Sequence, residues 1–280
     1  MQQLLLPSTF SFEETGKPHE GRLIIEPLFR GYGTTLGNAL RRVLLSSLPG
    51  AAVVAVKING VPHEFSTLDH VKEDMVEILL QLKQLRLRVF SEEEVRLHLS
   101  VKGEKEVTAY DIEPSAEVEI VNPELHIATL TDPKARFEVD LFMNQGRGYV
   151  PVEEQGKQRL ELGTIAVDAI FTPVINVGYN VEQVRVGEIT NYEKLIMTIE
   201  TDGTITPQKA VLSATTILLD HFNLAINALG GGSDVEGTHT ASDPEALQTA
   251  QEDEIVPIAE INEEPIEKPK AKRKPTKKKK

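Results

Sequence analysis

The sequence has 280 residues, of which 40% are hydrophobic, and contains no cysteine. A chain of this length can bury one large core or two smaller ones, and the absence of thiols excludes disulfides and thiolate metal sites. The formal net charge of -13 argues against a broad nucleic-acid-binding face, since phosphate contacts need clustered Lys and Arg. No apolar run approaches the ~20 residues that span a bilayer, so we expect a soluble, cytoplasmic protein without a membrane segment.

The first segment with helical periodicity begins after Gly33. Apolar side chains recur at helical spacing up to about Ser47, which predicts a helix with Thr34 or Thr35 as its N-cap. Leu48-Pro49-Gly50 then ends it.

A second helix is predicted over residues 68–85. The segment Ser66-Thr67-Leu68-Asp69 resembles a capping box with Asp in place of Glu. Its apolar stripe begins at Val71 and continues at Met75.

Strand patterns surround this second helix and follow it along the chain. Residues 95–102 and 137–143 alternate apolar with polar side chains, the period of a half-buried strand. The other predicted strands are residues 51–58, 105–112, 118–121, 164–171, 177–186 and 194–201. Because strands outnumber helices and do not alternate with them, we expect an α+β fold with mainly antiparallel sheets.

The third helix is predicted over residues 207–229, with Pro207 in its first turn. Apolar residues cover more of its circumference than one face can bury. Leu218 and Phe222 lie on one side, while Leu219 and Ile226 lie on another. A second subunit could bury the remainder, or the helix could lie inside one subunit; the pattern alone leaves both readings open.

After Gly230 the composition changes to a segment that we predict to be disordered. Residues 231–267 carry eleven acidic residues and no Lys or Arg, and residues 268–280 carry nine basic residues. Such a segment cannot bury enough apolar surface to offset its chain entropy. The lysine-rich end could make weak, nonspecific nucleic-acid contacts or could simply keep the chain soluble.

Residues 31–37 match a dinucleotide-binding glycine pattern only superficially. Pro27 interrupts the preceding apolar run, and no acid stands about 20 residues further on to bind a ribose. The histidines show no pair at i, i+4 spacing, and no nucleophile elbow occurs. We therefore predict no catalytic residue, no cofactor and no metal in this chain.

A glycine-rich loop is predicted over residues 146–151, after a strand. It could bring Arg147 and Tyr149 to a partner, although the chemistry alone favours a structural turn.

Several segments together resemble the alpha subunit of bacterial RNA polymerase. Residues 28–50, LFRGYGTTLGNALRRVLLSSLPG, are similar to the first-helix signature of that family. Further similar segments follow in the family's order: His63–Thr67, Glu73-Asp74, Leu79–Lys83, Gly146–Pro151, Tyr179–Glu182, Arg185–Gly187 and Thr201–Pro207.

The resemblance implies a homodimer with two subdomains. A discontinuous dimerisation subdomain, residues 1–49 and 165–230, would combine a mainly antiparallel sheet with two packed helices, and residues 50–164 would form an inserted, mostly-β subdomain. The first and third helices would pack against their symmetry mates. The residues implied at this dimer interface are Leu36, Leu40, Val43, Leu218, Phe222, Ala225 and Leu229.

The resemblance also implies contacts with the two large polymerase subunits. Arg42, Leu45 and Lys83 would contact the beta subunit. A further set would contact beta or beta-prime: Arg147, Tyr149, Asn180, Glu182 and Arg185. Nucleotidyl transfer and its Mg²⁺ would belong to those partners.

Many members of this family carry a C-terminal helical domain that binds promoter DNA. Residues 231–280 show no helical periodicity from which to build it, so specific DNA recognition is not expected here. The alternatives to a polymerase scaffold are an enzyme with its own pocket and a dimeric interaction module outside transcription.

Overall fold

The computed structural model describes residues 6–230, except for 156–160, 162 and 188. The predicted disordered segment, residues 231–280, lies outside the described residues. Within them, every strand pairing is antiparallel, which confirms the predicted α+β class. The α-helices are α1 (Tyr32–Ser46), α2 (Met75–Leu82) and α3 (Pro207–Ala228).

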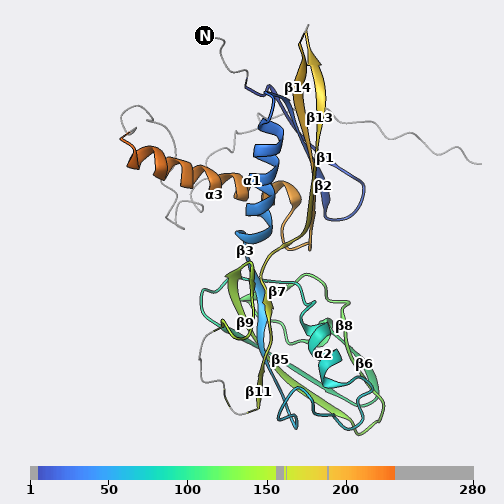
Figure 1. Ribbon diagram of the computed structural model, residues 1–280. Coiled ribbons are helices and arrows are strands. Elements are labelled where there is room, and N and C mark those ends of the chain that lie inside the picture. Colours follow the sequence, from blue (N-terminus) through green and yellow to red (C-terminus); the bar gives the residue numbers. More distant parts are fainter. Residues whose placement is uncertain (1–5, 156–160, 162, 188, 231–280) are drawn as a thin grey trace, which may run out of the picture. The chain divides into compact units, whose positions relative to one another are not determined.

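A four-stranded sheet lies beside α1 and α3 (Figure 1). Its strand order is β1 (Thr9–Glu14), β2 (Glu20–Leu28), β14 (Ile189–Thr201) and β13 (Val174–Val186). Both helices pack on the same face, because one hydrophobic cluster contains side chains from the sheet and from each helix. Strands from the two ends of the described chain thus pair to build one sheet.

The β-rich region inserted between these two parts has its own core. A second four-stranded sheet has the order β11 (Thr164–Ala166), β3 (Pro49–Ile58), β9 (Arg136–Arg147) and β5 (Val95–Lys102). The remaining pairs are β4 (Leu87–Val89) with β7 (Val118–Ile120), β6 (Lys105–Thr108) with β8 (His126–Leu130), and β10 (Tyr149–Val150) with β12 (Ala169–Ile170). Helix α2 packs in this core, and the cluster reaches Val167.

Alternation of apolar and polar residues predicted the edge strand β5 of the insert's four-stranded sheet well. Val95, Leu97, Leu99 and Val101 of β5 are buried while their neighbours are exposed or partly exposed. The pattern is preserved because one face of this sheet covers the core and the other meets solvent.

The predicted second helix was too long at its beginning. Val71 does not continue a helix but bridges to Leu130 of β8. The Glu73 carboxylate, on a side chain that is only 9% exposed, accepts hydrogen bonds from the Thr129 backbone N–H, at 2.6 Å, and from its hydroxyl, at 2.7 Å. This tertiary pairing holds the segment out of helical conformation, and Asp74 caps α2 instead by accepting from the Glu77 N–H at 2.8 Å.

Some strand predictions were incomplete. Residues 164–171 form two strands, β11 and β12, in different sheets. Residues 105–112 end in a 3-10 turn, Ala109–Asp111. Strands β1 and β2 were not predicted. Strand β2 includes Pro27, which an inner strand can tolerate here because the register with β14 shifts beside it.

The N-terminus of α1 is capped by a distant carboxylate and not by Thr34 or Thr35. Gly31 is the N-cap, with φ of 89°, and provides no side-chain cap. The Glu193 carboxylate of β14 accepts hydrogen bonds from the Gly31 N–H at 2.8 Å and the Gly33 N–H at 2.9 Å. A negative charge at this end also complements the helix dipole.

Two glycines of α1 allow the helix to lie very close to the sheet. A Cβ at Gly33 would come within 2.8 Å of Val181 Cγ1, and one at Gly37 within 2.7 Å of the Tyr179 ring. These glycines therefore serve helix–sheet packing.

Among the described residues, no helix is long and apolar enough to cross a membrane.

We predict that Glu193→Ala lowers the free energy of unfolding by about 1 kcal/mol, because two helix N–H groups lose their acceptor. Glu193→Gln should lose less, since the amide oxygen can still accept. Urea unfolding of the full chain followed by circular dichroism measures both. Equal stability of Glu193→Ala and the parent chain would show that water satisfies the helix end equally well.

Candidate protein-interaction surfaces

The described residues contain no group of three or more His, Asp or Glu side chains arranged to hold a metal. One depression, of about 480 Å³, is lined by Lys57, Asn59, His98, Glu138 and Asp140 among others. Its acids are already paired. Asn59 donates to Glu138 at 3.1 Å, and His98 Nδ1 lies 2.9 Å from Asp140.

The pKa of Asp140 shows that its carboxylate is stabilised by the groups bound to it. Burial raises the pKa of this carboxyl, but hydrogen bonds from Arg96, at 2.6 Å, and from His98 outweigh it, so the net pKa is lowered. A general acid or base needs a pKa near neutrality. This depression is therefore a network of paired charges on the outer face of the sheet.

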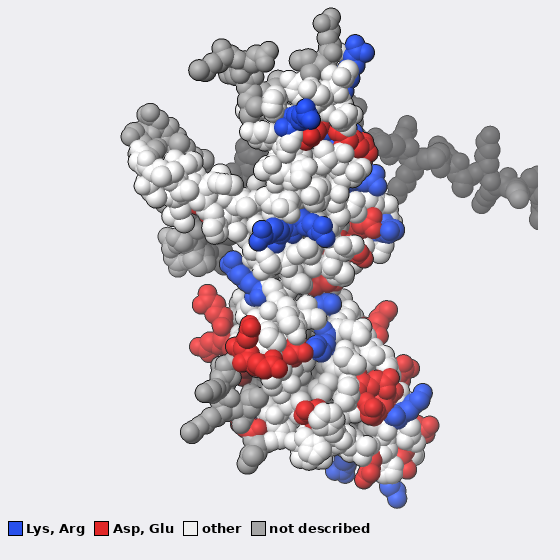
Figure 2. Space-filling view, in the orientation of Figure 1, with Lys and Arg blue, Asp and Glu red and all other residues white. Residues whose placement is uncertain are grey.

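The outer half of α3 is the largest exposed apolar feature of the described chain. Only Ala210 and Ala214 of this helix are buried. Beyond them the exposed fractions remain high at Leu219 (55%), Phe222 (62%) and Leu229 (88%). Figure 2 shows this helix as a projection almost free of charged side chains. Apolar surface of this extent marks an interaction site.

Several exposed residues of α3 form a stripe at alternating steps of three and four residues, the spacing that packs helices against each other. The stripe consists of the apolar residues Leu212, Leu219, Phe222, Ile226 and Leu229 and of Thr215, a polar residue. Leu224, which is 68% exposed, lies outside it.

The predicted dimer residues separate into two groups in the structure. Leu40 is buried in the core of its own subunit, and Leu36, Val43 and Leu218 are partly buried against that core. Phe222, Ala225 and Leu229 are exposed. The stripe members Leu212, Leu219 and Ile226 were not in the predicted set, because the sequence does not show which side of α3 meets the sheet.

The second surface begins at the C-terminal end of α1. Arg41 and Arg42 are exposed there, and Leu45 is partly exposed. Arg147 of β9 donates to the Ser47 backbone carbonyl at 3.3 Å. A Cβ at Gly148 would come within 3.1 Å of the Ser46 carbonyl oxygen. The predicted loop is therefore mostly strand, and the structure brings the junction of β9 and β10 at Gly148 against the end of α1.

Lys83 and Tyr149, far apart in sequence, meet at Asp168. Lys83 Nζ lies 3.0 Å from Asp168 Oδ2, and the Val152 N–H donates to Oδ1 at 3.1 Å. The Lys83 ammonium, helped by the Val152 N–H and the Tyr149 hydroxyl, holds the pKa of Asp168 below its usual value. Sequence reasoning missed Asp168, although an acid within the apolar run at 164–171 was a signal.

The remaining predicted contact residues lie elsewhere, on β13. Asn180 and Glu182 line a shallow depression with Arg22, on the sheet face away from α1. The residues that alternate with them along the strand, Tyr179 and Val181, pack toward α1. Arg185 donates to the Gly187 carbonyl at 2.7 Å near the hairpin end. The predicted contact residues thus form at least two separate patches.

A comparison with family models identifies the inserted region. Residues 56–172 match the RNA polymerase Rpb3/RpoA insert domain. The matched segment runs from within β3 to just after β12. The inserted region is thus similar to the insert domain of RpoA/Rpb3-type RNA polymerase subunits, which supports an RNA polymerase subunit of this type.

We predict that Lys83→Met raises the pKa of Asp168 toward its usual value of 3.8, because the ammonium that stabilises the carboxylate is removed. Carboxyl-carbon NMR during a pH titration measures it. Because the folded pKa is depressed, the stabilisation is present above about pH 3.8 and is lost as the pH falls through the folded value.

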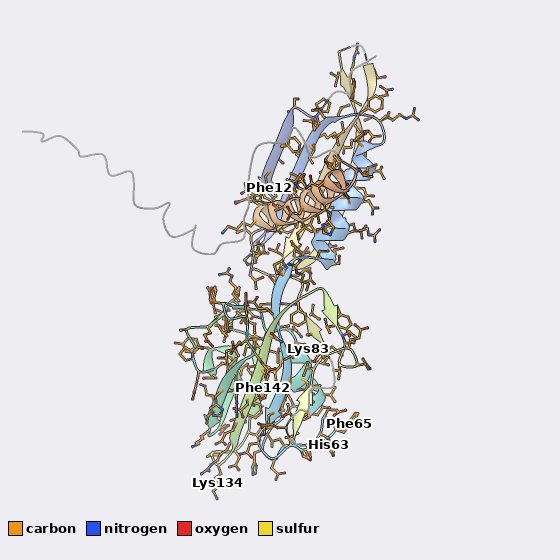
Figure 3. All side chains as sticks on the ribbon, turned by 90° about the vertical axis from the view of Figure 1, so that its left-hand side faces the viewer. Phe12, His63, Phe65, Lys83, Lys134 and Phe142 are labelled. Carbon is orange, nitrogen blue, oxygen red and sulfur yellow. The ribbon has the colours of Figure 1, made fainter. Side chains whose placement is uncertain are left out.

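Lys134→Met provides the control for this titration. Figure 3 labels Lys134 at the opposite end of the insert from Lys83, so this change should leave the Asp168 titration where it is. An Asp168 pKa that does not move in Lys83→Met would contradict the assigned ion pair.

Proposed function

We propose that this chain is the alpha subunit of a bacterial-type DNA-directed RNA polymerase. It would act as a homodimeric scaffold on which one beta and one beta-prime subunit assemble. The match of the inserted region to the RNA polymerase Rpb3/RpoA insert domain supports the enzyme class. The single observation that carries the scaffold role is the exposed apolar stripe of α3.

A second copy is the occupant that suits this stripe best. Its apolar members, Leu212, Leu219, Phe222, Ile226 and Leu229, would contribute roughly 10 kcal/mol from each copy if fully buried. Association costs about 4–15 kcal/mol. The burial free energy of both copies together therefore exceeds the cost of association, and self-association through α3 is energetically reasonable.

The proposed beta contact combines Arg42, Leu45 and Lys83 with the adjoining segment at Arg147 and Tyr149. An exposed arginine suits such a contact because its guanidinium pairs with carboxylates through two parallel hydrogen bonds. Asn180, Glu182 and Arg185 form a separate patch, which fits a contact with another subunit. In a dimer, one copy would face beta and the other beta-prime.

The chemistry of nucleotidyl transfer would lie in the partner subunits. We propose no catalytic residue and no cofactor in this chain, and the Mg²⁺ of the reaction would belong to the large subunits. A bacterial polymerase works in the cytoplasm, where we place this chain. We assign no promoter recognition to residues 231–280, whose sequence has no helical periodicity.

A dimeric interaction module outside transcription is the other candidate, since the apolar stripe alone would fit it. Co-purification separates the two: a tagged full chain should recover beta and beta-prime subunits in the first case. Recovery of a dimer without either large subunit would favour the second.

We predict that Phe222→Glu weakens the dimer at least about 100-fold, because a carboxylate would have to be buried without a partner. The control is Asn227→Glu, which adds the same charge at an exposed position about 140° around the helix from Phe222 and outside the stripe. Sedimentation equilibrium of the full chain measures both variants. A dimer equally strong in both would refute the proposed interface.

We predict that Arg42→Ala lowers recovery of the beta subunit at least about tenfold, through loss of charged hydrogen bonds, while the dimer persists. Arg41→Ala, which removes an arginine directed about 100° away, should cost much less. Pull-down with purified beta subunit and the mass of the free dimer give the two readouts. Undiminished beta recovery with Arg42→Ala would show that the contact is wrongly placed.

A further inference from the structure

Arg88 of β4 links the inserted region to the root of α3, by which we mean the turn at residues 202–204 just before this helix. Its Nε donates to the Thr204 carbonyl at 2.6 Å, and its Nη2 donates to the Gly203 carbonyl at 3.2 Å. Its Nη1 donates to Glu119 at 2.9 Å, directly across the β4–β7 pair. Three nitrogens of one guanidinium are thus engaged, two of them outside the insert.

The turn that receives Arg88 is held in shape by its own contacts. Asp202 Oδ1 accepts from the Thr204 N–H at 2.9 Å and from the Thr204 hydroxyl. Gly203 adopts φ of 93°, a left-handed conformation that suits glycine. The turn therefore presents two backbone carbonyls in a fixed direction, and Thr206 caps α3 two residues later.

The same segment of the insert leads directly to the proposed beta contact. Lys83 is the C-cap of α2, and only four residues lie between it and Arg88. Between them, Arg86 approaches Asp202, with Nε 4.0 Å from Oδ2. The Arg86 N–H also donates to Asn122 Oδ1 at 2.8 Å, which fixes the strand beside β7. A short, hydrogen-bonded segment therefore joins Lys83 to the root of α3.

We propose that Arg88 is a positioning residue that fixes the inserted region against the root of α3, so that the beta contact at Lys83 and the dimer helix keep one relative orientation. The inference rests on the proposed function for its consequence, because a partner that touches both α1 and the insert needs them correctly placed. The Arg88 hydrogen bonds themselves do not depend on it.

Arginine is required for this role because of its geometry. Its planar group directs several N–H donors outward in one plane, so it can serve Gly203, Thr204 and Glu119 at once. Lysine carries the same charge as a single donor group on a flexible stem. Arg88→Lys should therefore retain the charge but lose much of the orientation, and Arg88→Met should lose all three hydrogen bonds while keeping an apolar stem.

A distance measurement tests the orientation without any partner. The chain has no cysteine, so Glu13→Cys on β1 and Ser100→Cys on β5, both exposed, can carry spin labels. Labelled full chain is mixed with excess unlabelled chain, so that only distances within one subunit are recorded. Arg88→Met should broaden or shift the distance distribution, and Arg88→Lys should do so less.

Arg96→Met is the matched control, since Arg96 also pairs with an acid across the insert, Asp140, but not with the turn at 202–204. Its distance distribution should equal that of the parent. A distribution unchanged by Arg88→Met overturns the proposal, and so does an equal change in Arg96→Met.

Capture of purified beta subunit tests the consequence. Arg88→Met should reduce capture by the full chain about tenfold while the dimer mass and the melting temperature remain close to those of Arg96→Met. Capture as strong as that of the parent, despite a broadened distribution, overturns the link to assembly. If the parent chain itself neither dimerises nor captures beta, the proposed function fails, whereas the distance measurement still decides the role of Arg88.

Discussion

The close approach of α1 to its sheet is the constraint on which the rest of the structure depends. Gly33 and Gly37 leave no room for a Cβ against β13, and Glu193 of β14 closes the helix end. A helix held this closely cannot slide or rotate without a clash. Its far end, with Arg42 and Leu45, is therefore presented as a rigid surface.

The same close packing explains why α3 is left largely uncovered. Helix α1 and the first turns of α3 share one face of a four-stranded sheet. Only Ala210 and Ala214 of α3 are buried. Ile217 and Leu218 still pack against the core, but the longer apolar side chains from Leu219 onward are exposed in the described part of the chain. A helix that is apolar well beyond its own contact area needs a second surface, and a second copy of the chain supplies one with the same stripe.

The structure places predicted contact residues beside groups that the sequence did not indicate. The resemblance indicated Lys83 and Tyr149 as contact residues, and the structure places both at Asp168, which was not predicted. An ion pair between residues 85 positions apart leaves no periodic trace in the sequence. Residues 146–151 were predicted to be either a structural turn or a contact loop. In the structure Arg147 lies against the end of α1, so this segment makes a contact within its own subunit.

The antiparallel α+β class, the long third helix and half-buried strands such as β5 were predictable from local patterns, because burial on one side of an element repeats with that element's own period. Only the tertiary structure decided where α1 begins, where α2 begins, and which side of α3 stays exposed. Each of these depends on a group distant in sequence, namely Glu193, Thr129 or the sheet face. A hydrogen bond or core contact with such a group stabilises a conformation more than local propensity does.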